Sequence, residues 1–381
     1  MGNKAFNMGP IRPPSEANSL LLRVTEGCTW NKCKFCSVYR DTKFKIYQVE
    51  DIKQDIDAMA AFRDRIVGHI NSEGRVDHNA IIREMQMLPS EEQNCYYVVY
   101  NWLMNGGKSV FLQDGNSVAL KPEKLAEVLF YLREKFPHIE RITSYARAET
   151  LARHSVEQLK LLRESGLDRV HSGYESGSDK ILTKINKGLT QEQQIIAGRK
   201  VKEAGMELSV YFMPGIGGVE LSDENATETA YVISQIDPDF VRLRTFVVKD
   251  GSEMWDDFIR GDFVECDDFK KLEEIRKLIL NVKDCHGVLV SDHIINLIGS
   301  LTGHFDNDKE SMLMTIDKLF AMPERERKIY QLARRMGQLE GPEQLPGLVP
   351  QQRSKYEAII DSIKDEDEWN KMIDGILRNY I

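Results

Sequence analysis

Three cysteines lie within nine residues near the start of the chain. They are Cys28, Cys33 and Cys36, and their spacing is C-x4-C-x2-C. Thiolates this close in sequence can all point at one centre, because a tight loop brings their sulfur atoms within metal-binding distance. Zinc and an iron–sulfur cluster are the two metal centres that suit such ligands. The segment therefore predicts a metal centre.

No fourth ligand follows closely. A structural zinc site is normally closed by a fourth Cys or His, and the next histidine along the chain is His69. A [4Fe-4S] cluster on three cysteines instead leaves one iron free to bind a small molecule, whereas an electron-transfer ferredoxin uses a fourth cysteine. The spacing favours chemistry at a cluster, with a zinc loop as the alternative. The remaining cysteines, Cys95, Cys266 and Cys285, are too scattered for a second cluster and are interpreted as core thiols.

Strand and helix patterns alternate along the chain and must position these thiols. Helical patterns with one apolar face occupy 122–136, 156–165 and 190–204. Strand–helix–strand units in series favour a parallel sheet, so the expected fold class is α/β, a partial (β/α)6 TIM-like barrel. The predicted strands are 20–25, 110–113, 141–145, 169–174, 208–213 and 240–245.

The domain organisation follows from where this alternation stops. Residues 1–246 are expected to form the barrel core, with a helical insertion at 47–108 after the first strand. Residues 247–381 are expected to form an all-helical C-terminal region that covers the barrel, with a linker at 337–351. Its predicted helices are 268–285, 291–301, 309–320, 324–336 and a last pair within 352–381, after a loop or short helix at 249–263.

Composition narrows the class of protein. The 381 residues are 41% hydrophobic and carry a formal charge of −9, which fits a folded globular chain and argues against a nucleic-acid partner. No apolar run approaches the roughly 20 residues of a membrane span, and the N-terminus lacks the apolar core of a secretory signal. We therefore expect a cytoplasmic protein without a membrane span.

The cysteine triplet after the first predicted strand resembles the radical S-adenosylmethionine (SAM) superfamily, although the commonest spacing there is C-x3-C-x2-C. The resemblance extends over about 18–246 and is closest to the branch of oxygen-independent coproporphyrinogen dehydrogenases and methylthiotransferases. It implies a [4Fe-4S] cluster on Cys28, Cys33 and Cys36 whose open iron binds SAM. It also implies reductive cleavage of SAM to a 5′-deoxyadenosyl radical, which abstracts hydrogen from a substrate, and a reductant such as flavodoxin or ferredoxin.

The resemblance also implies SAM contacts. Phe35 occupies the position that contacts adenine, 113–117 the glycine-rich stretch after the second strand, and 172–178 the fourth-strand motif. Tyr145 stands where the coproporphyrinogen enzymes carry an acidic ribose ligand. The expected cofactor-binding residues are Phe35, Gln113, Asp114, Tyr145, Arg147, Ser172, Glu175, Lys187 and Tyr211.

The substrate is expected to be small and anionic, with a carboxylate among its groups. Arg242 and Arg244 alternate along the sixth predicted strand, so both guanidinium groups should point to one face, where they could hold a carboxylate or phosphate. His293, which follows a predicted helix start at Ser291, is the third candidate catalytic residue. The alternatives are a coproporphyrinogen dehydrogenase-like porphyrin enzyme and a non-catalytic iron–sulfur binding protein on the same scaffold.

Overall fold

The computed structural model describes residues 5–380, and they divide into two compact units. Unit 1 comprises the described part of Met1–Asn31, together with Val38–His171 and Lys200–Glu207. Unit 2 comprises Lys32–Ser37, Ser172–Arg199 and, through its described residues, Leu208–Ile381. The cysteine segment is thus shared between them.

Unit 1 is built on parallel strands. β1 (Leu20–Leu22) pairs with β4 (Ser109–Leu112), β4 with β5 (Arg141–Tyr145), and β5 with the first residues of β6 (Arg169–Glu175). Two short strands, β2 (Thr25–Glu26) and β3 (Lys45–Ile46), pair in antiparallel fashion. The other elements of this unit are η1 (Pro14–Glu16), α1 (Val49–Val67), α2 (His78–Gln86), α3 (Ser90–Met104), η2 (Ser117–Ala119), α4 (Pro122–Lys135), α5 (Ala148–Arg153) and α6 (Val156–Glu164).

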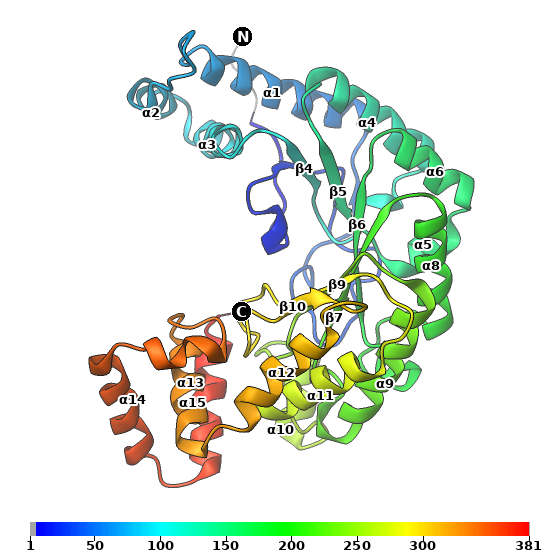
Figure 1. The fold of residues 1–381 in the computed structure, drawn as a ribbon. Coiled ribbons are helices and arrows are strands. Elements are labelled where there is room, and N and C mark those ends of the chain that lie inside the picture. Colours follow the sequence, from blue (N-terminus) through cyan, green and yellow to red (C-terminus); the bar gives the residue numbers. More distant parts are fainter. Residues whose placement is uncertain (1–4, 381) are drawn as a thin grey trace. The chain divides into compact units, whose positions relative to one another are not determined.

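Apolar faces hold the helices of unit 1 in place. α4 buries Leu125, Val128, Leu129 and Leu132 along one side, as its 3.6-residue period requires. α1 packs on α3 and α4, and α4 packs on α6, so these helices follow one another outside the strands (Figure 1). α1, α2 and α3 lie in the predicted helical insertion.

Unit 2 continues the parallel pattern. β7 (Glu207–Phe212), whose first residue belongs to unit 1, pairs with β8 (Phe240–Leu243), and β8 pairs with β9 (Val288–Val290); β10 (Thr302–His304) is antiparallel to β9. The helices are α7 (Asp179–Lys184), α8 (Gln191–Glu203, whose last residues belong to unit 1), α9 (Gly218–Ile236), α10 (Glu253–Arg260), α11 (Asp268–Asn281), α12 (Lys309–Phe320), α13 (Glu324–Arg335), η3 (Pro342–Gly347), α14 (Pro350–Ser362) and α15 (Glu366–Arg378). α13 packs against α14 and α15 at the red end of the chain (Figure 1).

The expected α/β class with a mostly parallel sheet is confirmed, but the region after residue 246 is not entirely helical. Residues 288–290 form β9 and 291–301 contain no helix, so the helix predicted there is wrong. Ser291 does not cap a helix: its Oγ donates to Ile298 O and accepts from Asn296 Nδ2. These side-chain bonds favour turns, and the β-branched residues before Ser291 pair with β8.

None of the helices within residues 5–380 is long and apolar enough to cross a bilayer.

Candidate functional site

The end of β4 holds the start of the cysteine loop in unit 1. Asp114 is fully buried, forms a 2.5 Å ion pair with Arg23 and accepts a hydrogen bond from Gly27 N at 3.2 Å. Gly115 N donates to Gly27 O at 3.1 Å, and a Cβ added to Gly115 would lie 3.0 Å from Cys28 Cβ. Glycine at position 115 therefore permits the close approach of the Cys28 backbone.

Asn116, also fully buried, ties this loop to the end of β5. Its Nδ2 donates to Thr29 Oγ1 at 3.0 Å and to Thr150 Oγ1 at 2.8 Å, and its Oδ1 accepts from Arg147 N at 3.0 Å. One amide thus fixes the residue after Cys28 and the backbone of Arg147.

Cys28 is half-buried among hydrogen-bond donors. Burial alone would raise the pKa of its thiol, but the backbone N–H groups of Trp30 and Asn31 and the guanidinium of Arg147 lower this pKa below its ordinary value. Arg147 Nη1 lies 3.9 Å from Cys28 Sγ. Because the thiolate is the form that binds metal, these donors suit Cys28 to ligate iron.

Cys33 and Cys36 lie in unit 2, on a segment held by backbone hydrogen bonds. Lys34 N donates to Ile185 O at 2.9 Å, Met254 N donates to Lys34 O at 3.2 Å, and Cys36 N donates to Cys33 O at 3.1 Å. The segment is therefore fixed against the end of α7 and the start of α10.

A buried ion pair lies beside this segment. Glu175, in the left-handed conformation with φ 62° at the end of β6, pairs with Lys187 at 2.6 Å. Lys187 Nζ lies 5.6 Å from the ring centroid of Phe35. A Cβ on Gly173 would collide with Glu175 Oε1 and lie 3.2 Å from Lys187 Nζ, so this glycine makes room for the pair. The structure thus brings three of the predicted cofactor-binding residues together.

The three cysteines of the segment are reduced, Cys28 in unit 1 and the other two in unit 2. Within residues 5–380, no group of three or more His, Cys, Asp or Glu side chains is arranged to hold a metal ion. The donor set itself fits a cluster: three reduced thiols on one short segment, one of which has a lowered pKa. The assignment of all three as ligands stays a proposal.

Gln113 and Tyr145 make protein contacts of their own. Gln113 Oε1 accepts from Gly9 N at 2.8 Å, and its Nε2 donates to Gly9 O at 3.1 Å and to Ile11 O at 3.3 Å. Its amide is thus bonded to the N-terminal segment. Tyr145 pairs with His171 in register across β5 and β6, and its ring meets that of Phe111 edge-on at 5.0 Å.

Ser172 and Tyr211 lie on strands of unit 2. Ser172 Oγ is buried without a hydrogen-bond partner among the described residues, an arrangement that leaves a polar atom for a ligand. Tyr211 is half-buried and pairs in register with Arg242, so the two side chains share one face of β7 and β8.

The two arginines of the sixth predicted strand lie in different environments. Arg242 is buried, forms an ion pair with Asp292 and donates from Nε to Ser209 Oγ at 3.1 Å. Arg244 lies one residue beyond the end of β8 and is exposed. The alternation of side chains along a strand does not extend to Arg244, so the prediction that both guanidinium groups point to one face does not follow from β8.

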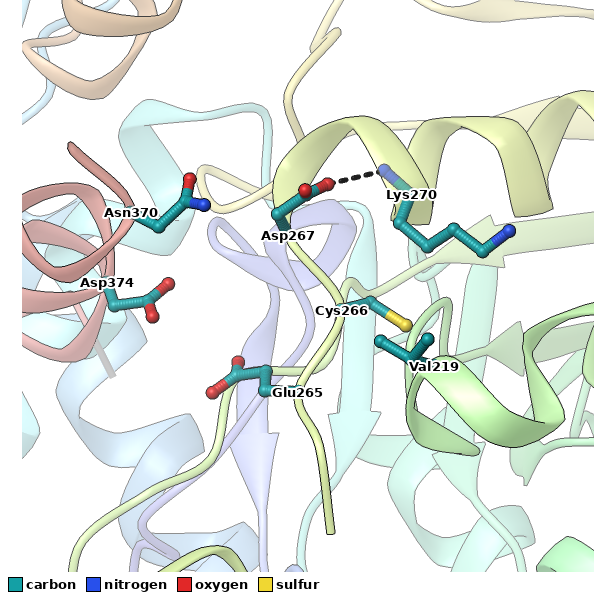
Figure 2. Close-up of a pocket in the computed structure, with 7 residues that line it drawn as sticks. All are labelled: Val219, Glu265, Cys266, Asp267, Lys270, Asn370 and Asp374. Carbon is teal, nitrogen blue, oxygen red and sulfur yellow. Dashed lines mark hydrogen bonds between the residues drawn. The ribbon is translucent and has the colours of Figure 1, made fainter. Parts of the chain in front are cut away.

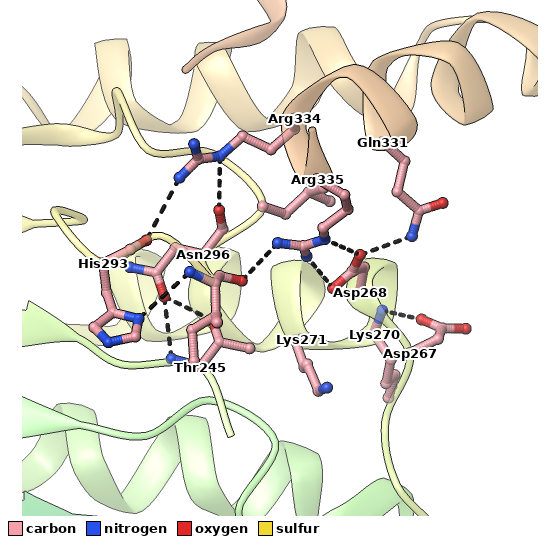
Figure 3. A network of polar contacts seen from close by, with 12 residues as sticks. Thr245, Asp267, Asp268, Lys270, Lys271, His293, Asn296, Gln331, Arg334 and Arg335 are labelled. Carbon is pink, nitrogen blue, oxygen red and sulfur yellow. Dashed lines mark hydrogen bonds and ion pairs between the residues drawn. The ribbon is translucent and has the colours of Figure 1, made fainter. Parts of the chain in front are cut away.

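His293 lies in a polar network between the turn after β9 and α13 (Figure 3). Burial, together with the nearby charges of Arg244 and Arg334, lowers the pKa of His293 to about 4, so its imidazole is neutral at pH 7. Its backbone oxygen faces Arg334, whose Nε also donates to Asn296 O at 3.0 Å. A neutral imidazole can accept a proton or donate a hydrogen bond to a substrate.

A buried carboxylate in unit 1 was not among the expected residues. Glu16 is fully buried, accepts a hydrogen bond from Ser19 Oγ and lies 3.5 Å from Arg141 and 3.6 Å from His171. Burial alone would raise the pKa of Glu16, but His171, Ser19 and Arg141 lower it. No sequence signal marks this network, because Arg141 and His171 are far from Glu16 along the chain.

Unit 2 also contains a pocket of about 280 Å³ that holds none of the expected site residues (Figure 2). Burial and the neighbouring Glu265 raise the pKa of Asp374 to about 6. The lining residues are Val219, Glu265, Cys266, Asp267, Lys270, Asn370 and Asp374.

Comparison with known proteins identifies the family. Residues 22–230 match the radical SAM superfamily, and the chain belongs to it. Members of this superfamily use a [4Fe-4S] cluster and SAM.

The chain is 27% identical over 198 residues to 4′-phospho-dehydrooxetanocin synthase of Priestia megaterium. This alignment covers 51% of this chain and 23% of that protein. It is 21% identical over 183 residues to the heme chaperone HemW of Bacillus subtilis, covering 48% and 47%. The chain therefore spans less than half the length of these relatives.

Similar solved structures include the cobalamin-dependent SAM radical enzyme OxsB, at 13% identity and a TM-score of 0.46, covering 96% of this chain and 59% of that one. Methylornithine synthase PylB matches at 14% identity and a TM-score of 0.42, covering 78% and 70%.

Proposed function

We propose that this chain is a radical SAM enzyme whose [4Fe-4S] cluster is held by Cys28, Cys33 and Cys36. The observation that carries the proposal is the position of these three thiols, in the loop that follows β2 and inside the region that matches the superfamily. When bound and reduced, the cluster supplies reductive cleavage of SAM to methionine and a 5′-deoxyadenosyl radical, which takes hydrogen from the substrate.

The residues of unit 2 contribute a site for the adenosyl and amino-acid parts of SAM. Phe35 offers an aromatic face, and Glu175 offers a carboxylate that Lys187 holds at 2.6 Å. Ser172 offers an unpaired buried hydroxyl. We extend the same cofactor-binding role to Tyr211, Tyr145, Arg147, Gln113 and Asp114, the last two acting through the loop that they support.

The proposed substrate is a small molecule with a carboxylate. Arg244 is exposed, and its charge is close enough to His293 to lower the pKa of that imidazole. The two side chains could therefore bind a carboxylate together. Arg242, already paired with Asp292, would act by fixing the end of β8. The proposed electron donor is a low-potential protein such as flavodoxin or ferredoxin, and the proposed compartment is the cytoplasm.

A non-catalytic role is the second candidate. The heme chaperone HemW is similar to 48% of this chain, and its name describes a chaperone and not a catalyst. A coproporphyrinogen dehydrogenase-like porphyrin enzyme is a variant of the first candidate, with arginines binding propionate groups.

The test is SAM cleavage by the anaerobically reconstituted full chain. Dithionite and SAM are added, and 5′-deoxyadenosine is measured by liquid chromatography. We expect product from the natural chain and from Cys95→Ala, which removes a thiol buried elsewhere in unit 1, but none from Cys33→Ala. A reduced natural chain with a full cluster and no product would favour the non-catalytic role, and product from Cys33→Ala would refute the ligand assignment.

A further inference from the structure

The guanidinium of Arg147 faces the thiol of Cys28. Its Nη1 lies 3.9 Å from Cys28 Sγ, within the longer reach of hydrogen bonds to sulfur. We propose that Arg147 is a positioning residue of the cluster site, which donates to the Cys28 sulfur and makes one-electron reduction of the cluster easier. This inference deepens the proposed function and rests on Cys28 being a cluster ligand.

The charge of Arg147 is fixed in place. The residue is 8% exposed, its backbone N–H is bound by Asn116 Oδ1 at 3.0 Å, and its guanidinium carbon lies 5.5 Å from the ring centroid of Trp30. Stacking on an aromatic face is an arrangement that suits guanidinium more than ammonium. The side chain therefore lies near both the Trp30 ring and the Cys28 sulfur.

One buried amide, that of Asn116, holds the partners of this contact together. Asn116 binds both Thr29, the neighbour of Cys28, and the backbone of Arg147, so the loop and the start of α5 share one buried amide. Because Asn116 holds both sides, the contact between Arg147 and Cys28 is preorganised. All of these residues belong to unit 1.

The sign of the effect follows from electrostatics. One electron is added to the cluster by a low-potential donor, with no bond formed or broken and no proton moved, and the negative charge near Cys28 grows. The guanidinium of Arg147 is positively charged, and a buried positive charge interacts more strongly than one in water. Hydrogen bonds to cluster sulfurs are among the factors that set cluster potentials.

The test is a redox titration of the reconstituted full chain, followed by electron paramagnetic resonance of the reduced cluster. In Arg147→Gln we expect the ratio of reduced to oxidised cluster at a fixed potential to fall at least tenfold, which corresponds to a shift of about 59 mV for one electron. Arg147→Lys keeps the charge and should fall less. Arg153→Gln, which changes an exposed arginine at the other end of α5, should match the natural chain.

The outcomes separate this inference from the proposed function. Iron and sulfide are counted first in each variant and in Cys28→Ala. A full cluster in Cys28→Ala would refute the ligand assignment itself. If Cys28→Ala loses the cluster, the ligand assignment stands. In that case an unchanged potential in Arg147→Gln, or equal shifts of potential in Arg147→Gln and Arg147→Lys, would overturn only the role of the Arg147 charge. If Arg147→Gln fails to hold iron, Arg147→Lys decides. A reduction potential equal to that of the natural chain supports the inference, and a tenfold or larger fall in the ratio of reduced to oxidised cluster overturns it.

Discussion

The two parts of the cysteine segment are held by different kinds of interaction. In unit 1, the turn at Gly27 and Cys28 is fixed by buried polar side chains, Asp114 and Asn116, from the end of β4. In unit 2, the turn at Cys33 and Cys36 is fixed by backbone hydrogen bonds and by the packing of Phe35 on an apolar cluster. Three similar thiols in sequence therefore depend on different physical forces.

This difference predicts which substitutions damage each part. A buried charge that loses its partner is costly, whereas apolar packing weakens in proportion to the area lost, and a partly exposed ion pair contributes little. Asp114, Phe35 and Lys34 make these three kinds of interaction, in that order. The effect of replacing each one is measured by chemical denaturation together with hydrogen exchange, which reports the segment that loosens.

Asp114→Asn should have the largest effect. Asparagine keeps the acceptor for Gly27 N and tolerates the positive φ of 73° at this position. It removes the buried carboxylate that pairs with Arg23 at 2.5 Å, so that Arg23 keeps only the longer 3.6 Å pair with Glu26. We expect a loss of about 3–5 kcal/mol in the free energy of unfolding. Asp57→Asn, which breaks a half-exposed pair with Lys135, is the control.

Exchange in Asp114→Asn should rise in residues 20–29 and not in 179–185. Equal losses of stability in Asp114→Asn and Asp57→Asn would show that the buried pair is not what holds the Cys28 loop.

Phe35→Ala should have an intermediate effect. The ring is half-buried against a cluster that includes Ile181, Ile185 and Met254, so the loss should fall below the full cost of a core phenylalanine, at about 1–3 kcal/mol. Exchange should rise in α7 and α10. Phe35→Leu, which keeps most of the apolar contact, is the matched variant, and a loss as large as that of Phe35→Ala would contradict the packing account.

Lys34→Ala should have the smallest effect. Its 3.2 Å pair with Asp257 joins side chains that are 33% and 17% exposed, and Lys34 is bound mainly through its backbone. We expect a change below about 1 kcal/mol, smaller still at high salt. A loss comparable with that of Asp114→Asn would mean that ion pairing also holds the second turn.

Much of the fold was predictable because local signals agree with it. The strand at 141–145 and the helix at 309–320 have the bounds predicted from their patterns. Thr190 and Gln193 form the reciprocal bonds of the expected helix start. The helix predicted at 291–301 is absent. Ser291 precedes an apolar run, as a helix-capping serine does, but its hydroxyl donates to Ile298 O in the turn instead.

The site was predictable where chemistry is local and not where it depends on tertiary contacts. Glu175 and Lys187 were both expected at the cofactor site from their motif positions, but their ion pair with each other was not predicted. The bonds from Asn116 to Thr29 and to Arg147 could not, because they join three separate strand ends. Arg242 and Arg244 differ in burial because β8 ends at Leu243, and strand alternation does not apply beyond that residue.

The most direct test of the account is whether SAM binds an iron of the cluster. The reconstituted, reduced chain is mixed with SAM labelled isotopically at its amino nitrogen and measured by electron–nuclear double resonance. An iron left open by three cysteine ligands predicts a hyperfine coupling from the labelled nitrogen to the cluster. A full cluster with no coupling at saturating SAM would contradict the account.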